Sequence, residues 1–450
     1  MAADRPGTPS EAQGAAAVPL VGAAGGPSAT VGKAERPPIP RDAMLLASAI
    51  FLFVSATNLL TPLVPMVRLD LGVSIATAGV IVGSYGFARL MADIPSGFLS
   101  DRFGHRRLSI FSVLLLIASS FVGVVANSVG VLVAARVGSG IAVGFLATIV
   151  LSALSATAST QNRGKVMSLF HVANNTGIAV YPLVGGVIGA TLGWRETFLA
   201  TASLSVVGAI LLLSVLPRID FSRGGRRGGG DESRVLHGRQ RTVASLATHV
   251  GVVANMIHRH GFRNTVLPLY AATSLALGGV SIATAIALMS VTGLLVATPG
   301  GMLGDRIGRR RVITAGLAAV AAGDLAFMLS HDLLTFILLA ALIGFGDFFT
   351  SSQTALLSEI VPASERTRSL AGYRFSSDLG ALLGPIVLAA VMDGYGAHAA
   401  ILVAVGVLFT ASAIAWLGVP ARVESVGPHE PTLVPVSLNA PSLQQEEASR

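Results

Sequence analysis

The chain has 450 residues, of which 52% are hydrophobic and only 12% are charged. Soluble domains carry about 25% charged residues, so this composition, with a mean hydropathy of +0.71, indicates a polytopic membrane protein and argues against a soluble enzyme. The net charge of +8 would suit nucleic-acid binding, but the basic residues cluster between apolar runs, and the absence of cysteine excludes disulfides and thiolate metal sites.

The apolar segments divide the chain into two similar parts. Residues 1–42, rich in Ala, Gly and Pro, predict a disordered cytoplasmic tail. Apolar stretches long enough to span a membrane, which takes about 20 residues, then recur six times within 43–217 and six times within 246–418. A polar linker at 218–245 separates the two sets, and a polar tail follows at 419–450. The pattern predicts an all-α membrane protein with 12 transmembrane helices in two six-helix bundles.

Basic residues gather in the short loops after the second, fourth, eighth and tenth stretches. They are Arg102, Arg106, Arg107, Arg163, Lys165, Arg306, Arg309, Arg310, Arg311, Arg366 and Arg368. The loops on the other side contain Arg68 and Arg195. Because Lys and Arg are retained on the cytoplasmic side, we expect both termini, the linker and the basic loops to be cytoplasmic, in a plasma (inner) membrane.

Two segments occur twice in the chain. GFLSDRFGHRR at Gly97–Arg107 returns as GMLGDRIGRRR at Gly301–Arg311, and GVSIATA occurs at Gly72–Ala78 and at Gly279–Ala285. Six stretches separate the copies, so the two halves are related and run in the same orientation. Both copies of the first segment resemble the signature loop of the major facilitator superfamily, and the resemblance covers about residues 43–418.

The resemblance implies the major facilitator fold, with a solute path between the halves. It also implies that the two signature loops gate this path. The residues concerned are Gly97, Asp101, Arg102, Gly104, Arg106, Gly301, Asp305, Arg306, Gly308 and Arg309. The first loop departs from the family pattern at His105, where a basic residue is usual.

Further motifs resemble those of the twelve-span drug:proton antiporter branch. Arg136 begins an R-x-x-x-G-x-x-x-G motif in the fourth stretch, and the resemblance implies that it contacts the solute or couples protons. The fifth stretch resembles the antiporter motif G-x-x-x-G-P-x-x-G-G, with Tyr181 in place of the second Gly. Its helix-packing residues, which let helices approach closely, are Gly177, Pro182, Gly185 and Gly186.

Charged residues inside apolar stretches are candidates for function, because each costs roughly 2.5–3.5 kcal/mol at a helix centre. Asp347 is the best-centred carboxylate, and we expect it either to carry the coupling proton or to make a structural hydrogen bond. Arg89 and Asp93 stand four residues apart and predict mutual neutralisation on one helix face. Arg374 and Asp378 repeat this spacing. Asp93 is the second candidate proton carrier.

The seventh stretch carries an unusual load of polar residues, namely Asn255, His258, Arg259, His260, Arg263 and Asn264. Either this face lines water and pairs with acids, or the span begins only near Phe262 and the cluster lies at the membrane surface. A positively charged cavity wall would favour anionic or zwitterionic solutes. The candidate cavity residues are Asn58, Asn174, Asn175, His258, His260, Arg263, Tyr373 and Asp378.

These features predict a secondary active transporter that exports a drug or metabolite in exchange for protons by alternating access. One alternative is a proton-coupled importer or facilitator of a small anionic metabolite, and another is a sensor or assembly subunit that transports nothing. No phosphate-binding loop or catalytic arrangement is legible, so we expect neither an enzyme nor a cofactor or metal. The expected partners are the lipid bilayer, a small-molecule substrate and protons, with no nucleic acid, and a monomer is the default state.

Overall fold

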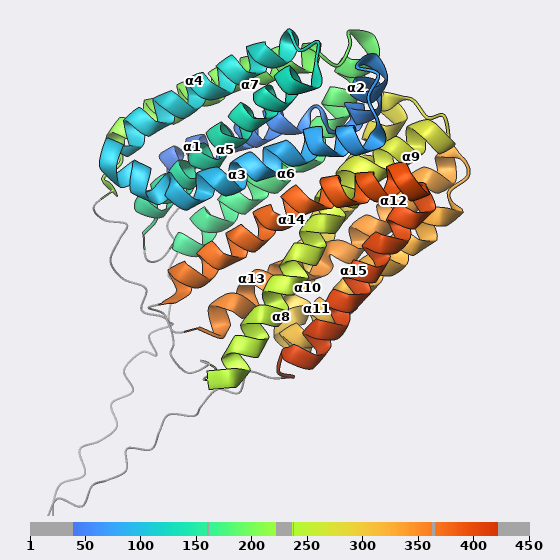
Figure 1. The fold of residues 1–450 in the computed structure, drawn as a ribbon. Helices are drawn as coiled ribbons and strands as arrows, with labels where there is room; N and C mark the ends of the chain where they lie inside the picture. The colour runs from blue at the N-terminus through green and yellow to red at the C-terminus, as the bar shows by residue number, and fades with distance from the viewer. Residues whose placement is uncertain (1–38, 160–161, 222–235, 237, 362–364, 422–450) are drawn as a thin grey trace, which may run out of the picture. The chain divides into compact units, whose positions relative to one another are not determined.

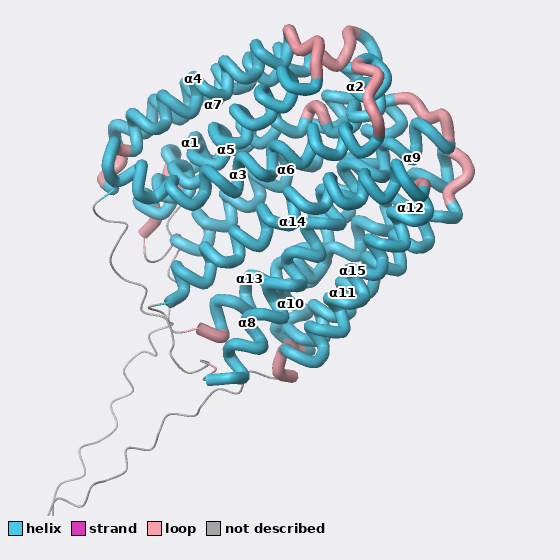
Figure 2. Tube along the Cα trace, in the orientation of Figure 1, coloured by secondary structure: helices cyan, strands magenta, loops and turns pink. Residues whose placement is uncertain are grey.

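The computed structural model describes residues 39–159, 162–221, 236, 238–361 and 365–421. The described part of the chain is helical almost throughout and contains no strand, as Figure 2 shows. The predicted all-α class is therefore confirmed. The predicted tails and linker lie largely outside the described residues.

The helices of the amino-terminal half come from residues 41–218. They are α1 (Arg41–Asn58), η1 (Thr61–Leu63), α2 (Val64–Asp70), α3 (Ile75–Phe103), α4 (His105–Val124), α5 (Val129–Thr157), α6 (Arg163–Thr191), α7 (Glu196–Val215) and η2 (Leu216–Arg218). Thr61 and Pro62 begin the short helix η1, so the first predicted span is α1, η1 and α2 in succession.

The carboxy-terminal half follows from residue 238 onwards. Its helices are α8 (Gly238–Met256), η4 (Ile257–Val266), α9 (Leu267–Ser274), α10 (Gly279–Ile307), α11 (Arg309–Ala326), η5 (Phe327–Leu329), α12 (Leu333–Gly346), η6 (Asp347–Phe349), α13 (Thr350–Glu359), α14 (Arg366–Tyr395) and α15 (Ala397–Gly418). The segment η4 is π-helical and joins α8 to α9 without a break, so the helix does not begin at Phe262.

Ten of the described helices are long and apolar enough to cross a membrane. The two remaining long helical segments are α6 and the continuous run from α8 through η4 to α9, and both contain more polar residues. The count by this measure is ten rather than the predicted twelve.

The twofold repeat of the sequence is also a repeat of local structure. Gly104 ends α3 at φ +82°, and Gly308 ends α10 at φ +97°, a region that favours glycine. Each glycine lets the chain turn directly into the next helix. We call the end of the bundle that carries these two turns the basic end, and the other the opposite end. Prolines also recur, with Pro95 inside α3 and Pro299 inside α10.

The two halves meet along two pairs of helices, α3 with α14 and α6 with α10. Figure 1 shows α3 and α14 side by side in the middle of the bundle. Toward the opposite end, a Cβ on Gly79 would stand 2.3 Å from the Cβ of Ala389, and one on Gly186 would stand 2.3 Å from the Cβ of Ala283. The absence of side chains at these glycines lets helices from different halves pack backbone against backbone.

Gly300 offers a test of how closely the carboxy-terminal half is packed. A Cβ at this position of α10 would stand 1.9 Å from the carbonyl oxygen of Phe348 in η6. Gly300→Ala should therefore destabilise the protein by about 1–3 kcal/mol through overpacking, seen as a lower melting temperature in detergent. Gly130→Ala is the matched control, because its Cβ would meet nothing within 4 Å. Equal melting of the two variants would contradict the prediction.

Candidate functional site

A small polar cavity lies where the two halves meet. Its volume is about 40 Å³, enough for ordered water. The amino-terminal half contributes two residues of α6, and the carboxy-terminal half contributes residues of η4, α10, η6 and α13. The lining residues are Asn175, Ile178, Arg259, Arg263, Ser290, Gly293, Leu294, Ala297, Asp347 and Thr350.

The cavity wall contains a buried ion pair. Arg263 of η4 is 2% exposed and Asp347 of η6 is 6% exposed, and their charged groups are 4.0 Å apart. Arg263 also donates a hydrogen bond to the hydroxyl of Ser290. The glycine at position 293 gives Asp347 room, since a Cβ there would stand 3.2 Å from Oδ2. The Oδ1 atom of Asp347 is buried with no hydrogen-bond partner among the described residues, so it can accept one.

A second cation faces the same cavity. Arg259 lies one π-helical turn from Arg263 and has no acidic partner among the described residues. Tyr373 of α14 lies within electrostatic range of Arg259. With Arg259 and Arg263 against the single carboxylate of Asp347, the cavity wall carries one excess positive charge when Asp347 is ionised.

Of the eight predicted cavity residues, Asn175 and Arg263 line this cavity, and the other six lie outside its lining. His258 points into the carboxy-terminal half, where its Nδ1 is 2.8 Å from Oδ2 of Asp324, and both side chains are almost fully buried. The prediction that His258 lines the cavity is therefore wrong. Asn58 folds back and donates to the carbonyl of Val54 at 2.7 Å. His260 does not line the cavity and lies within electrostatic range of four arginines, namely Arg259, Arg89, Arg263 and Arg136.

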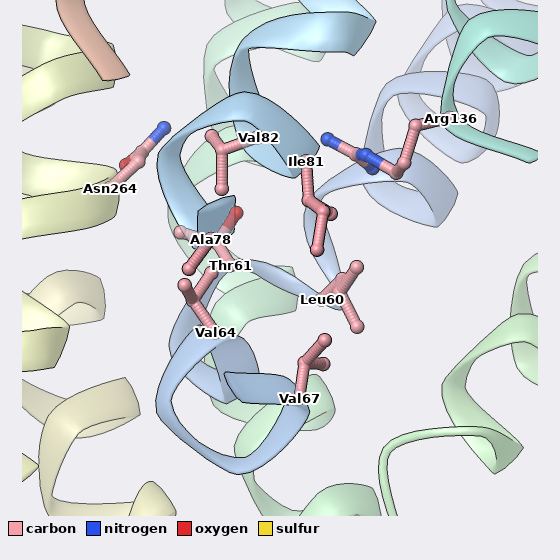
Figure 3. Close-up of a pocket in the computed structure, with 9 residues that line it drawn as sticks. All are labelled: Leu60, Thr61, Val64, Val67, Ala78, Ile81, Val82, Arg136 and Asn264. Atoms are coloured by element: carbon pink, nitrogen blue, oxygen red, sulfur yellow. The ribbon is translucent and has the colours of Figure 1, made fainter. Parts of the chain in front are cut away.

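Arg136 is enclosed in the amino-terminal half. Its guanidinium lies 4.7 Å from the ring centre of Tyr85 and donates to the carbonyl of Thr57 at 3.4 Å. It has no carboxylate partner among the described residues. Figure 3 shows it beside Ile81 at the edge of a small, mostly apolar pocket that Asn264 of η4 reaches from the other half.

The Arg and Asp residues of α3 and α14 meet across the two halves. Arg89 Nε lies 3.5 Å from Asp378 Oδ1, so the expected neutralisation within each helix gives way to a pair between helices. Asp93 lies within interaction range of the Asp378 carboxyl. Arg374 donates to the hydroxyl of Thr148 in α5 at 3.4 Å.

The glycines of the R-x-x-x-G-x-x-x-G motif hold α5 against this charged face of α3. A Cβ on Gly140 would stand 2.6 Å from the carbonyl oxygen of Tyr85, and one on Gly144 would stand 3.4 Å from Oδ1 of Asp93. The motif thus fixes the backbone of α3 at the level of Arg89 and Asp93.

Comparison with known proteins agrees with this architecture. The family described as Major Facilitator Superfamily matches residues 46–258 and 261–442. The chain belongs to the Major Facilitator Superfamily. It is 29% identical to a cephamycin export protein of Amycolatopsis lactamdurans over 49% of this chain and 44% of that protein, so the match spans less than half of the relative. It is 26% identical to a chloramphenicol resistance protein of Streptomyces lividans over 79% of this chain and 90% of that protein.

A solved transporter structure shares the fold. A crystal structure of the peptide transporter POT in complex with sulfate matches with a TM-score of 0.72 and 15% identity, over 87% of this chain and 97% of that one. The protein is therefore a multi-pass membrane protein of a transporter superfamily, and its resemblance to the drug-export branch is confirmed by the named relatives.

The two superfamily signature loops differ in their contacts. In the second loop, Arg309 pairs with Asp305 and, at 3.0 Å, with Glu359 of α13. His105 occupies the matching place in the first loop and stacks on Phe221 with ring centres 3.8 Å apart. Asp101 is exposed and forms no ion pair with another described residue. The second loop is thus bound to its own half, while the carboxylate of the first remains available.

The glycines of the fifth predicted span serve two interfaces. A Cβ on Gly177 would stand 2.9 Å from Oγ of Ser55 in α1, and one on Gly185 would stand 1.9 Å from the carbonyl oxygen of Leu59. Gly186 instead faces α10 of the other half. Pro182 lies inside α6 between these contacts.

Some residues of the site were not named as candidates from the sequence. Ser290 and Thr350 are ordinary helix residues until the fold brings them to the cavity. Asp324 lies near the end of an apolar stretch, and this place in the sequence gives no sign of its contact with His258. A hydroxyl or carboxylate of this kind gives no pattern until its neighbours on other helices are known.

Proposed function

We propose that this protein exports small molecules in exchange for protons, by alternating access of the polar cavity between its two halves. The observation that carries the proposal is the Arg263–Asp347 pair in a cavity lined by both halves. The relative named as a cephamycin export protein supports the direction. We infer twelve spans, counting α6 and the run from α8 to α9, with the basic end and both termini in the cytoplasm of a plasma membrane.

The proposed coupling follows from the charges at the cavity. A solute that is cationic, or that donates a hydrogen bond to ionised Asp347, competes with a proton for the same carboxylate. Proton binding then releases the solute, and the two move in opposite directions. The proton-coupling role belongs to Asp347 in this scheme, with Arg263 holding the carboxylate in place.

The conformation supports rocking of the halves. The close glycine contacts of α3 with α14 and of α6 with α10 lie toward the opposite end, where the backbone NH of Ile75 also donates to Asp393 Oδ1 at 3.1 Å. We infer that these contacts close the outer face. In the reverse state Asp101 of the first signature loop would engage the other half at the basic end, whereas Asp305, bound to Arg309, serves to brace its own half.

A second function is favoured by one observation, the unpaired Arg259. An anionic solute would bind better when Asp347 is protonated, because the wall then carries two uncompensated cations. Proton and anion would travel together, which describes a proton-coupled importer or facilitator of a small anionic metabolite.

Transport in proteoliposomes with an imposed pH gradient tests both functions. Lumenal pH is followed while cationic, neutral, zwitterionic and anionic solutes are added to wild type, Asp347→Asn and the exposed control Asp332→Asn. We expect solutes to dissipate the gradient by exchange in wild type and in Asp332→Asn, and not in Asp347→Asn. If only anionic solutes move protons, and in the same direction as themselves, the result would contradict export and support the second function. If no solute moves protons in wild type, the protein is a facilitator or a sensor that transports nothing.

A further inference from the structure

We propose that Asp93 of α3 and Asp378 of α14 share one proton, and that this proton together with Arg89 locks the two halves in the conformation seen here. The proposal rests on the alternating access proposed above, but it concerns a site separate from the solute cavity. It assigns a proton-binding role to a carboxyl pair that neither half possesses alone.

The first argument is the register of the two helices. Glycines at positions 83 and 86 of α3 approach the backbone of α14 at Leu382 and Ala381 to about 3 Å or less, measured from an added Cβ. Moving toward the basic end, the next turn brings Arg89 opposite Asp378. The glycine contacts therefore set the two charged turns against each other and leave little space between the helices.

The second argument is a shortage of hydrogen-bond donors. Arg89 is the cation in direct contact with Asp378, at 3.5 Å, while both oxygens of Asp93 and the Oδ2 of Asp378 are buried with no hydrogen-bond partner among the described residues. Asp378 is only 3% exposed. Two neighbouring carboxylates cannot both ionise at little cost in a site of low dielectric. One proton between them removes their repulsion and supplies the missing donor.

The other charged and titratable groups around the pair do not provide that donor. Arg374, on α14, lies within electrostatic range of Asp378 but donates its hydrogen bond to Thr148. Tyr85 lies on the Arg89 side, between Arg89 and Arg136. The histidines on the neighbouring elements point to other partners: His249 of α8 lies 3.1 Å from Ser376 Oγ, His171 of α6 lies near Arg374, and His260 of η4 lies near Arg89.

The physical consequence is a proton-dependent contact between the halves. With the proton bound, the two carboxyls do not repel each other, and Arg89 holds α3 and α14 together through its contact with Asp378. When the proton leaves, the two carboxylates repel each other across the interface. Raising the pH should therefore favour separation of α3 from α14 and depopulate this conformation.

The absence of cysteine from the sequence makes the test direct. Spin labels on Phe103→Cys and Ile307→Cys, two exposed and equivalent positions at the basic end, report the distance between the halves in nanodiscs. Without any solute, we expect the population with the distance of this structure to fall as pH rises. Asp93→Asn and Asp378→Asn should each keep that population at every pH, because the amide replaces the protonated acid. In Asp347→Asn and Asp332→Asn, this population should fall with rising pH as it does in wild type.

Several results would overturn the proposal. They are a wild-type distance that does not depend on pH, amide variants that titrate normally, or a response abolished by Asp347→Asn alone. Infrared difference spectra of wild type should also show a protonated carboxyl band that titrates together with the distance change. Its absence would equally refute a shared proton, even if the variants failed to fold. Since no solute is present, an intact titration alongside failed solute–proton exchange would refute only the proposed function.

Discussion

Asp324→Ala should destabilise the carboxy-terminal half by about 1–3 kcal/mol or more, because it leaves the ring nitrogen of His258 buried without its partner. The two side chains are 2% and 0% exposed, so water cannot replace the lost carboxylate. His258 is also held by stacking on Phe262, whose ring centre is 5.6 Å away, and so cannot turn toward solvent. The cavity left by the shorter side chain adds to the loss.

Thermal unfolding in detergent measures this effect. The control is Asp101→Ala, at an exposed position without an ion pair among the described residues, and it should melt close to wild type. The double variant His258→Phe/Asp324→Leu should recover most of the lost stability, because apolar residues can replace a buried polar pair when both partners are exchanged. Transport by the folded fraction of the double variant should remain. A single variant as stable as wild type, or a double variant no better than the single one, would contradict a purely structural pair.

Arg136→Met should affect transport rather than stability. We expect transport to fall tenfold or more and the stability of the protein to stay unchanged or increase. The guanidinium occupies a buried position at an insertion cost of roughly 2.5–3.5 kcal/mol, and no carboxylate of a described residue pairs with it to offset this. Its contacts are the ring of Tyr85 and the carbonyl of Thr57, of which a cation–π contact contributes about 0.5–2 kcal/mol. Arg136 therefore does not stabilise the fold, and we expect its charge to be needed for transport instead.

Transport and melting of Arg136→Met are to be measured on the same preparation. Arg195→Met is a matched control, since Arg195 pairs with Asp70 at a partly exposed site and should not affect transport strongly. Arg136→Lys keeps the positive charge but not the planar guanidinium. Partial transport by this variant would show that the charge of Arg136 is what transport requires. Loss of folding in Arg136→Met, or full transport, would show that the residue is structural or dispensable.

The repeated local structure could be predicted from the sequence, because the duplicated segments contain glycines that determine the backbone geometry. Gly104 and Gly308 are the turns that the duplicated signature segment implied. Asp347 and Arg263, both singled out as charges in apolar stretches, lie side by side at the cavity. A charge inside an apolar stretch is informative because placing it in the membrane costs free energy, so a partner of opposite charge is expected nearby.

Pairing between helices could not be predicted in the same way. The four-residue spacing of Arg89 and Asp93 describes one helix face, but it does not say which other helix meets that face. The structure brings Asp378 there, so the local pair becomes a contact between halves. The contact between His258 and Asp324 could not be predicted for the same reason, since 66 residues separate them and only the fold brings their side chains together.

The π-helical stretch Ile257–Val266 also determines how the cavity wall responds to a change in the length of the chain. A π-helix accommodates an extra residue in each turn compared with an α-helix, so losing one residue there can be absorbed by tightening the helix. The side chains on one side of the deletion would then turn by about 100° relative to those on the other. Arg259 and Arg263 could be parted in this way without substituting either. A one-residue insertion or deletion at this point would therefore change the charge pattern of the cavity wall, as a point mutation would.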